Sequence, residues 1–204
     1  RYGFQTVKLK IGREPSKDMD VVREVRAALG PAVKIRVDAN QGYDVATAIK
    51  TLRQMERYDL ELVEQPVAKW NLLGMAEVTA ALDTPIEADE SMFGLHDAMT
   101  LIRLKACDIL NIKIMKPCGL YGSKKVAAAA EGAGLTCLVG SMVEFGPGTA
   151  ASLHFAAAPR VVAHACEPVG GFLFQDDVVE QDFGLAAVEN GCLRVPEEPG
   201  LGIT

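Results

Sequence analysis

The sequence predicts an α/β fold of successive parallel strand–helix units that closes into a barrel. Short apolar stretches repeatedly end on a charged residue, and these end points recur about every 24 to 28 residues, the length that a strand, a crossover and a helix need. They are Lys10, Asp38, Glu64, Asp89 and Lys113. Ser141 and Glu167 continue the same rhythm. We therefore count seven strand–helix units.

Flat and closed arrangements both accommodate parallel strands in chain order. In a flat sheet, Lys10 and Lys113 would lie four strands apart, or about 19 Å at roughly 4.8 Å per strand. In a barrel, the carboxyl ends of all strands surround one mouth, where such enzymes place their chemistry. Because five strands in a row end on a charged residue, we prefer the barrel. The 204 residues are fewer than the roughly 250 of a typical eight-stranded barrel, so we expect one strand at the amino end to be absent from this chain.

Helices are predicted between the strands from amphipathic or alanine-rich stretches. The expected ranges are 18–29, 44–55, 71–82, 94–104, 119–132 and 148–158. Asp18 and Asp44 are the expected N-caps of the first two helices. The glycines of Gly146–Gly148 open the last helix, whose amide groups could meet an anion.

The segment after Glu167 does not continue the rhythm. Residues 187–195 predict a β-hairpin on a type I′ turn at Asn190-Gly191, and 196–204 is a loop rich in proline and glycine. We therefore assign 1–185 to the barrel and 186–204 to a carboxyl-terminal hairpin and tail.

Composition limits the classes of partner. The chain is 49% hydrophobic with a net charge of −6 and no basic cluster, which argues against binding to nucleic acid. Apolar runs stay well below the roughly 20 residues that span a bilayer, so no membrane association is expected. Five cysteines without a C-x-x-C pair indicate reduced thiols in a cytoplasmic protein.

Three of the strand ends carry acids that predict a metal site. Asp38, Glu64 and Asp89 close adjacent units in matched phase, and three converging carboxylates repel one another unless a cation lies between them. Ligation by oxygen alone suits Mg²⁺ or Mn²⁺. The alternative is that each acid is an ordinary helix cap or a solvated loop residue.

Lysines complement these acids. Lys8 and Lys10 alternate with apolar residues and therefore share one side of their strand. Two neighbouring ammonium groups lower each other's pKa, which makes Lys10 a candidate general base. Lys113 would meet the other face of a bound substrate. Surface salt bridges are the alternative for each lysine.

Taken together, these motifs resemble the enolase superfamily, in its muconate-lactonizing subgroup, which also includes mandelate-racemase-like enzymes. The motifs are Lys8-Leu9-Lys10, Asp38-Ala39-Asn40, Glu64-Gln65-Pro66, Asp89-Glu90-Ser91 and Asn111-Ile112-Lys113. The resemblance implies a TIM-type (β/α)7β barrel preceded by an α+β capping domain. We expect the capping domain and the first barrel strand to be absent here, and the terminal hairpin to pack toward that domain.

The resemblance also implies a reaction. Mg²⁺ (or Mn²⁺) on Asp38, Glu64 and Asp89 would hold a substrate carboxylate, and Lys10 or Lys113 would move a proton at the adjacent carbon through an enediolate. Lys8 would tune Lys10. A homo-oligomer is expected.

Glu167 bears on the choice of reaction. It matches the acid that muconate cycloisomerases carry after the last strand, where dipeptide epimerases usually show Asp-x-Asp, although a structural role for Glu167 is equally open. Lys116-Pro117-Cys118-Gly119 departs from the expected Lys-x-Gly-Gly. We expect an isomerase or lyase acting on a small carboxylate, most like a cycloisomerase. Alternatives are a racemase or epimerase of an N-acyl amino acid or dipeptide, an acid dehydratase, and a non-catalytic acid-binding barrel.

Overall fold

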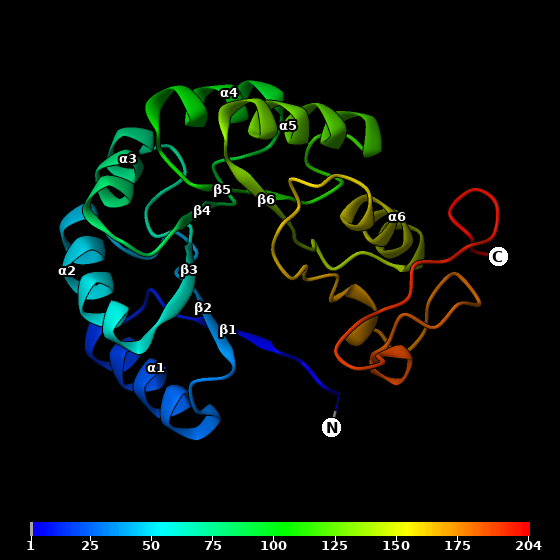
Figure 1. The fold of residues 1–204 in the computed structure, drawn as a ribbon, viewed down its shortest axis with the longest axis horizontal. Coiled ribbons are helices and arrows are strands. Elements are labelled where there is room, and N and C mark those ends of the chain that lie inside the picture. Colours follow the sequence, from blue (N-terminus) through cyan, green and yellow to red (C-terminus); the bar gives the residue numbers. More distant parts are fainter. Residues whose placement is uncertain (1) are drawn as a thin grey trace. The chain divides into compact units, whose positions relative to one another are not determined.

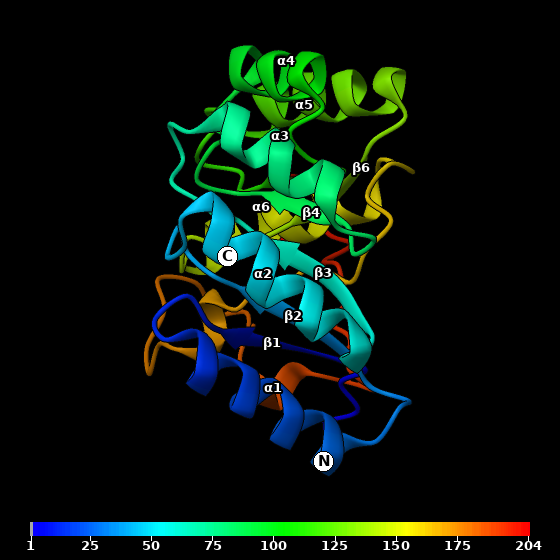
Figure 2. The same cartoon turned by 90° about the vertical axis from the view of Figure 1, so that its left-hand side faces the viewer.

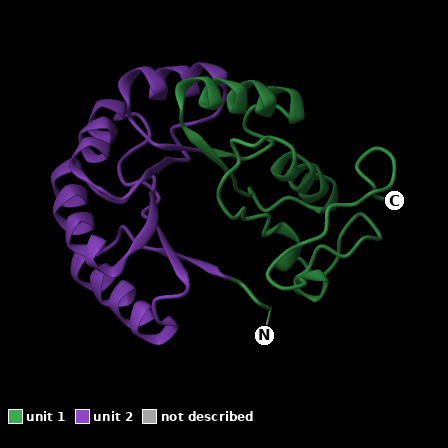
Figure 3. Cartoon of the chain, viewed as in Figure 1, with its two compact units in different colours: residues 1–4, 111–204 green, residues 5–110 purple. Residues whose placement is uncertain are grey.

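The structure is a computed structural model that describes residues 2–204. It contains two compact units, shown in different colours in Figure 3. Unit 2 is Gln5–Leu110, and unit 1 is Asn111–Thr204 together with the first four residues. Each unit is described by itself below.

Unit 2 alternates strands and helices along the chain (Figure 1). Its elements are β1 (Thr6–Lys10), α1 (Pro15–Leu29), β2 (Lys34–Asp38), α2 (Val45–Met55), the 3-10 helix η1 (Glu56–Tyr58), β3 (Leu60–Glu64), α3 (Leu72–Ala81), β4 (Ile86–Ala88), α4 (Leu95–Leu104) and the start of β5 (Ile109–Ile112). Helices α1, α2 and α3 lie side by side over one face of β1, β2 and β3 (Figure 2).

The pairings of β1 with β2, β2 with β3, β3 with β4 and β4 with β5 are parallel, and hydrogen bonding orders the strands from β1 to β6 as they occur in the chain. The register places Lys10 opposite Asp38, and Asp38 opposite Glu64. Strands of parallel sheets are covered on both faces and therefore read as apolar runs, and Val37, Leu62 and Val63 are fully buried. The register thus brings three charged strand ends to one edge of the sheet.

Unit 1 contains the end of β5, followed by α5 (Leu120–Ala133), β6 (Thr136–Val139), α6 (Gly146–Ala157) and the 3-10 helices η2 (Gly170–Phe172) and η3 (Leu185–Ala187). Gly140 N donates to Ile112 O at 3.2 Å just past β6. Partly buried hydrophobic side chains from the last 26 residues pack against a small core of Ala150, Leu153 and Phe183. The partly buried side chains are Val179, Leu193, Val195, Leu201 and Ile203.

The expected seventh strand is the main correction to the predicted fold. The segment 161–166 makes a single parallel bridge between Cys137 and Val162. Ala163 N donates to Cys137 O and Glu167 N donates to Val139 O, so four residues of this segment span the length of two residues of β6. The surplus residues interrupt the ladder as a bulge does. Residues 2–204 therefore hold six strands. Closure of the sheet into a barrel stays a prediction.

The first helix also begins earlier than expected. Its first residue is Pro15 and its N-cap is Glu14, so the assignment of Asp18 as the cap was wrong. The buried Asp18 carboxylate instead accepts hydrogen bonds from the backbone N–H groups of Gly12, Arg13 and Glu14, and from the Tyr43 hydroxyl at 2.6 Å. It holds the loop that follows β1.

Other local predictions are confirmed. Asp44 caps α2 by accepting from Thr47 N at 2.8 Å. Asn190 and Gly191 both have positive φ, 51° and 80°, and the residues on either side, Glu189 and Cys192, exchange both backbone hydrogen bonds. This is the geometry of a type I′ turn, although beyond it the hairpin makes no further bridge in the described residues.

Within residues 2–204, all five cysteines are free thiols. No helix in this range is both long enough and apolar enough to cross a bilayer.

Arg26 joins two loops of unit 2 at the end where the strands begin. Its guanidinium donates to Tyr58 O (2.9 Å), Asp59 O (2.9 Å), Gly30 O (2.8 Å) and Val33 O (2.7 Å). These carbonyls belong to the segments that lead into β2 and β3, so one side chain fixes where both strands start. The planar fork of arginine allows four such bonds at once, and the single nitrogen of lysine does not.

We expect Arg26→Lys to lower the free energy of unfolding by about 2 kcal/mol, because most of these charge-assisted hydrogen bonds are lost. Urea unfolding followed by circular dichroism measures the change. Arg23→Lys is the control, because Arg23 contacts only exposed acids on its own helix. Equal midpoints for both variants would contradict the assigned role of Arg26.

Candidate active site

The candidate site lies in unit 2 at the carboxyl ends of β1 to β4. Asp38 and Glu64 are the last residues of β2 and β3, and Asp89 directly follows β4. All three acids are buried, with 1%, 0% and 3% exposure. Such burial is costly for a charged group unless a cation or hydrogen bonds compensate it, so these are not the solvated loop acids of the alternative interpretation.

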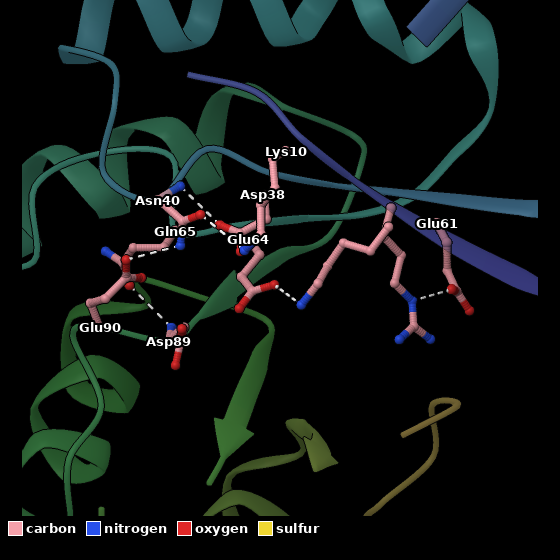
Figure 4. Close-up of polar contacts among 10 residues, drawn as sticks. Lys10, Asp38, Asn40, Glu61, Glu64, Gln65, Asp89 and Glu90 are labelled. Carbon is pink, nitrogen blue, oxygen red and sulfur yellow. Dashed lines mark hydrogen bonds and ion pairs between the residues drawn. The ribbon is translucent and has the colours of Figure 1, made fainter. Parts of the chain in front are cut away.

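Two lysines of β1 form ion pairs with two of the acids; Lys10, Asp38 and Asn40 are labelled in Figure 4. Lys8 Nζ donates to Glu64 Oε2 at 2.7 Å, and Lys10 Nζ donates to Asp38 Oδ2 at 2.5 Å and to Asn40 Oδ1 at 2.9 Å. Both lysine side chains come from the same side of β1, as their alternation predicted. Lys10 is well exposed, whereas Lys8 is largely covered.

The acids are close enough to influence each other electrostatically. Burial raises the pKa of Glu64; Lys8 opposes this, the charges of Asp38 and Asp89 add to it, and the resulting pKa is about 8. Burial is the main cause, and the smaller contributions of Asp38 and Asp89 show that the three carboxyl groups lie close enough to repel one another when ionised. A cation bound there would relieve the repulsion.

The donor set fits a hard divalent cation. Asp38, Glu64 and Asp89 offer only carboxylate oxygens as ligands, and Mg²⁺ and Mn²⁺ prefer oxygen ligands. Within residues 2–204, no three acidic, histidine or cysteine side chains are already turned toward one point that could hold a metal. Asp38 and Glu64 bind the lysine ammonium groups instead, and to hold a metal these carboxylates would have to exchange one positive partner for another.

The loops beyond the strand ends are joined by further polar contacts. Glu90 Oε1 accepts from Asn40 Nδ2 and from Gln41 Nε2, each at 3.2 Å. Asn40 thereby links Lys10 to Glu90. Asn40, Gln41 and Gln65 have positive φ values of 41°, 69° and 36°. Strained backbone of this kind persists where the surroundings fix it and often marks functional sites.

A buried ion pair lies one side-chain layer below the strand ends. Arg36 of β2, only 1% exposed, donates from Nε to Glu61 Oε2 at 2.6 Å, and Lys34 Nζ donates to Glu61 Oε1 at 2.9 Å. The register between β2 and β3 shifts between Ile35 and Arg36. Glu87 of β4, also fully buried, lies opposite Glu64 in the register.

Comparison with known proteins places this arrangement in a family. The family model described as "Enolase C-terminal domain-like" matches residues 1–204. The chain belongs to this family. The sequence is 40% identical over 205 residues to the L-Ala-D/L-Glu epimerase of Clostridium acetobutylicum, covering 100% of this chain and 56% of the relative. The chain therefore spans about half the length of the curated relatives that it matches.

Solved structures show the same likeness. The dipeptide epimerase from Enterococcus faecalis V583 matches with a TM-score of 0.95 at 35% identity, over 100% of this chain and 58% of that one. The muconate cycloisomerase from Pseudomonas fluorescens matches with a TM-score of 0.94 at 33% identity, over 100% and 56%. The resemblance to the muconate-lactonizing subgroup of the enolase superfamily is thereby confirmed.

Five of the seven predicted site residues of this enolase-family chain come together in unit 2. The other two, Lys113 and Glu167, belong to unit 1. Lys113 directly follows β5 and is partly buried, and Glu167 follows the Cys137–Val162 bridge. Their part in a common site stays a prediction.

The expected anion site at the start of α6 is filled by the chain itself. Gly146 N donates to both carboxylate oxygens of Asp177 at 2.8 Å. The sequence argument did not foresee this, because Asp177 is 31 residues away in the sequence.

Sequence analysis also missed residues that organise the site. Glu87 and Gln65 are fully buried, but Glu87 lies inside β4 and Gln65 carries no charge, so the search for charged strand ends passed over them. One signal was present for Gln65. A polar residue between a buried strand and Pro66 has little room to reach solvent, and its amide must therefore find partners inside the protein.

We expect Glu61→Gln to destabilise the protein by about 2 to 3 kcal/mol at neutral pH, because it removes the carboxylate charge that the buried Arg36 Nε contacts. Burial alone would raise the pKa of Glu61, but the hydrogen bonds and charges of Arg36 and Lys34 outweigh it and lower that pKa below 4.5. A lowered pKa in the folded state gives stability that is present above the unfolded value and is lost as the pH falls through the folded value.

The stability difference between the natural protein and Glu61→Gln should therefore shrink as the pH is lowered below about 4.5. Urea unfolding at several pH values measures it. Glu24→Gln, at an exposed position on α1, is the control and should show no such trend. A difference that is independent of pH would contradict the ionised Glu61–Arg36 pair.

Proposed function

We propose that the protein is a metal-dependent isomerase that moves a proton at the carbon next to a substrate carboxylate, through an enediolate. The observation that carries this proposal is the grouping of three buried strand-end acids with Lys8 and Lys10 in one unit. Membership of the enolase family supports it. The whole protein's activity is inferred here, since the chain spans only part of its relatives.

Asp38, Glu64 and Asp89 would hold Mg²⁺ or Mn²⁺, and the ion would supply a fixed positive charge for the carboxylate oxygens of the substrate as negative charge builds up there. Burial of the three acids favours this, because a site with little water strengthens the attraction. With the ion in place, Lys8 and Lys10 would be free of the carboxylates that they contact in this structure.

Lys10 is the proposed proton-transfer residue of unit 2. Its long, exposed side chain ends beside Asn40, whose amide can hold the Nζ atom while the amine takes a proton from the substrate carbon or returns one to it. Lys8 stays largely covered and adds positive charge next to Lys10. Lys113 of unit 1 is the proposed partner base, which would serve the opposite face of the same carbon.

Epimerisation of a dipeptide is the reaction that we place first. The relative with 40% identity is an L-Ala-D/L-Glu epimerase, and the solved structure with a TM-score of 0.95 is a dipeptide epimerase. This ranking departs from the sequence analysis, which placed a cycloisomerase first. Two lysines that can each donate or accept a proton are what an epimerase requires.

Cycloisomerisation stays the second candidate because of Glu167. The expected Asp-x-Asp of dipeptide epimerases is replaced here by Ala165-Cys166-Glu167, and an acid at the position of Glu167 resembles the muconate enzymes. The chloromuconate cycloisomerase CbnB of Cupriavidus necator is 35% identical over 197 residues, covering 96% of this chain and 52% of that relative.

The remaining expectations are proposals of the same kind. We propose a small carboxylate as the substrate, the cytoplasm as the location and a homo-oligomer as the assembly. We also propose that 1–185 is the barrel portion and that 186–204 packs toward a capping domain.

Magnesium binding tests the acid cluster. We expect Asp89→Asn to weaken Mg²⁺ binding, measured by isothermal titration calorimetry, by more than the roughly 10- to 100-fold that loss of an outer-shell partner costs. Asp44→Asn is the matched control, because Asp44 also lies shortly after β2 but only caps α2. If both variants bind Mg²⁺ as well as the natural protein does, Asp89 is not a ligand.

Exchange of the substrate proton tests the lysines. In D₂O with Mg²⁺, the full-length protein should incorporate deuterium at the glutamate α-carbon of L-Ala-L-Glu and form its epimer, as followed by NMR. Lys10→Ala and Lys113→Ala should each slow this exchange by about 10²- to 10⁴-fold. Lys125→Ala, at an exposed position on α5, should leave it unchanged.

The outcomes separate the candidates. If the protein turns over cis,cis-muconate but does not exchange the α-proton of the dipeptide, cycloisomerase replaces epimerase as the proposed function. Mg²⁺-dependent binding of these carboxylates with no exchange and no turnover would favour the non-catalytic acid-binding barrel.

A further inference from the structure

We propose that Gln65 is a positioning residue that fixes Asp89 relative to Glu64 and thereby sets the affinity of the strand-end acids for Mg²⁺. This inference rests on the proposed function, because it concerns the same metal site. Gln65 touches no substrate; it would act through the backbone that carries two of the ligands.

Gln65 is placed between the two acids by its own backbone. It directly follows Glu64, and its backbone N donates to Glu87 O at 2.9 Å, two residues before Asp89. On its other side, its carbonyl accepts from Gln41 N at 2.9 Å. The backbone of Gln65 therefore extends the β3 ladder beyond the last strand residue toward both neighbouring loops.

The side chain then reaches across to the loop after β4 (Figure 4). Gln65 Oε1 accepts from Asp89 N at 3.0 Å and from Ser91 N at 3.1 Å. Gln65 Nε2 donates to Ser91 Oγ at 2.8 Å and to Val67 O at 2.9 Å. Two acceptor positions and two N–H donors are the full capacity of a glutamine amide, so each of them has a partner.

Burial makes these contacts decisive. Gln65 is 0% exposed, so water cannot replace the hydrogen bonds of its amide. Its φ of 36° places its backbone in the left-handed region. A buried amide that loses its partners is expensive. The loop is therefore locked in the one arrangement that satisfies the amide, and the Asp89 backbone has little freedom to turn its carboxylate away from Glu64.

A purely structural role makes a different prediction, and the chain offers a matched control at the other end of β4. Glu56 Oε1 accepts from Asp83 N at 2.7 Å and from Thr84 N at 2.8 Å. Like Gln65, it holds two backbone amides beside β4 with one side-chain oxygen. Unlike Gln65, it does so at the end of the strand away from Asp89.

The experiment compares Gln65→Met with Glu56→Met in the full-length protein. The Mg²⁺ dissociation constant is measured by titration calorimetry, and the stability without metal by urea unfolding in EDTA. Methionine matches the length of both side chains and removes the hydrogen bonds. We expect Gln65→Met to bind Mg²⁺ about 10- to 100-fold more weakly, the cost typical of outer-shell partners. Glu56→Met should bind within about 2-fold of the natural protein, although unfolding becomes easier in both variants.

A milder variant covers the case in which Gln65→Met does not fold. Ser91→Ala removes the hydrogen bond that Ser91 Oγ accepts from Gln65 Nε2 and the one that it donates to Lys69 O at 3.1 Å. Loss of the hydrogen bond between Gln65 and Ser91 corresponds to about 2- to 10-fold weaker Mg²⁺ binding.

Each result decides the question. If the natural protein binds Mg²⁺ and Gln65→Met, or Ser91→Ala in its place, binds it equally well, the positioning role is overturned while the metal site stands. The same holds if Glu56→Met weakens binding as much as Gln65→Met does, because the effect is then one of general stability. If the natural protein binds no Mg²⁺, the metal site and the positioning role fail together.

Discussion

Neutralisation of the buried carboxylates at the strand ends is the constraint on which the rest of unit 2 depends. Parallel pairing in register brings Asp38 and Glu64 side by side, and Glu87 occupies the corresponding place on β4. Negative charge of this density is tolerable away from water only with cations close by. Lys8 and Lys10, both from β1, provide them for Glu64 and Asp38.

The loops around this charge are held by side chains that bind backbone rather than by packing alone. Asp18 collects three consecutive N–H groups after β1. Gln65 holds two backbone amides just after β4, and Glu56 holds two just before it. Arg26 gathers four carbonyls where β2 and β3 begin. Such contacts cost little where the donor or acceptor is already ordered, and they define loop geometry more sharply than apolar contacts do.

Much of this could be foreseen from the sequence because it follows from local rules. The strands 6–10, 34–38 and 60–64 are short apolar runs between loops, and their spacing identified Asp38 and Glu64 as neighbours. The seventh strand could not be judged in the same way, because its residues have strand-like composition and only the pairing with β6 reveals two surplus residues. Asp18 was misassigned because a carboxylate near the start of a helix can cap it or bind the preceding loop, and distant Tyr43 decides between these. The role of Gln65 depends on three loops meeting, which no local pattern encodes.

The pairing of Lys8 with Glu64 and of Lys10 with Asp38 also ties the edge strand β1 to its neighbours. Lys10 reaches the adjacent strand β2, and Lys8 reaches past it to β3. One strand therefore joins three by charge as well as by its backbone ladder, and a slip of its register would leave buried acids of both partner strands without these contacts.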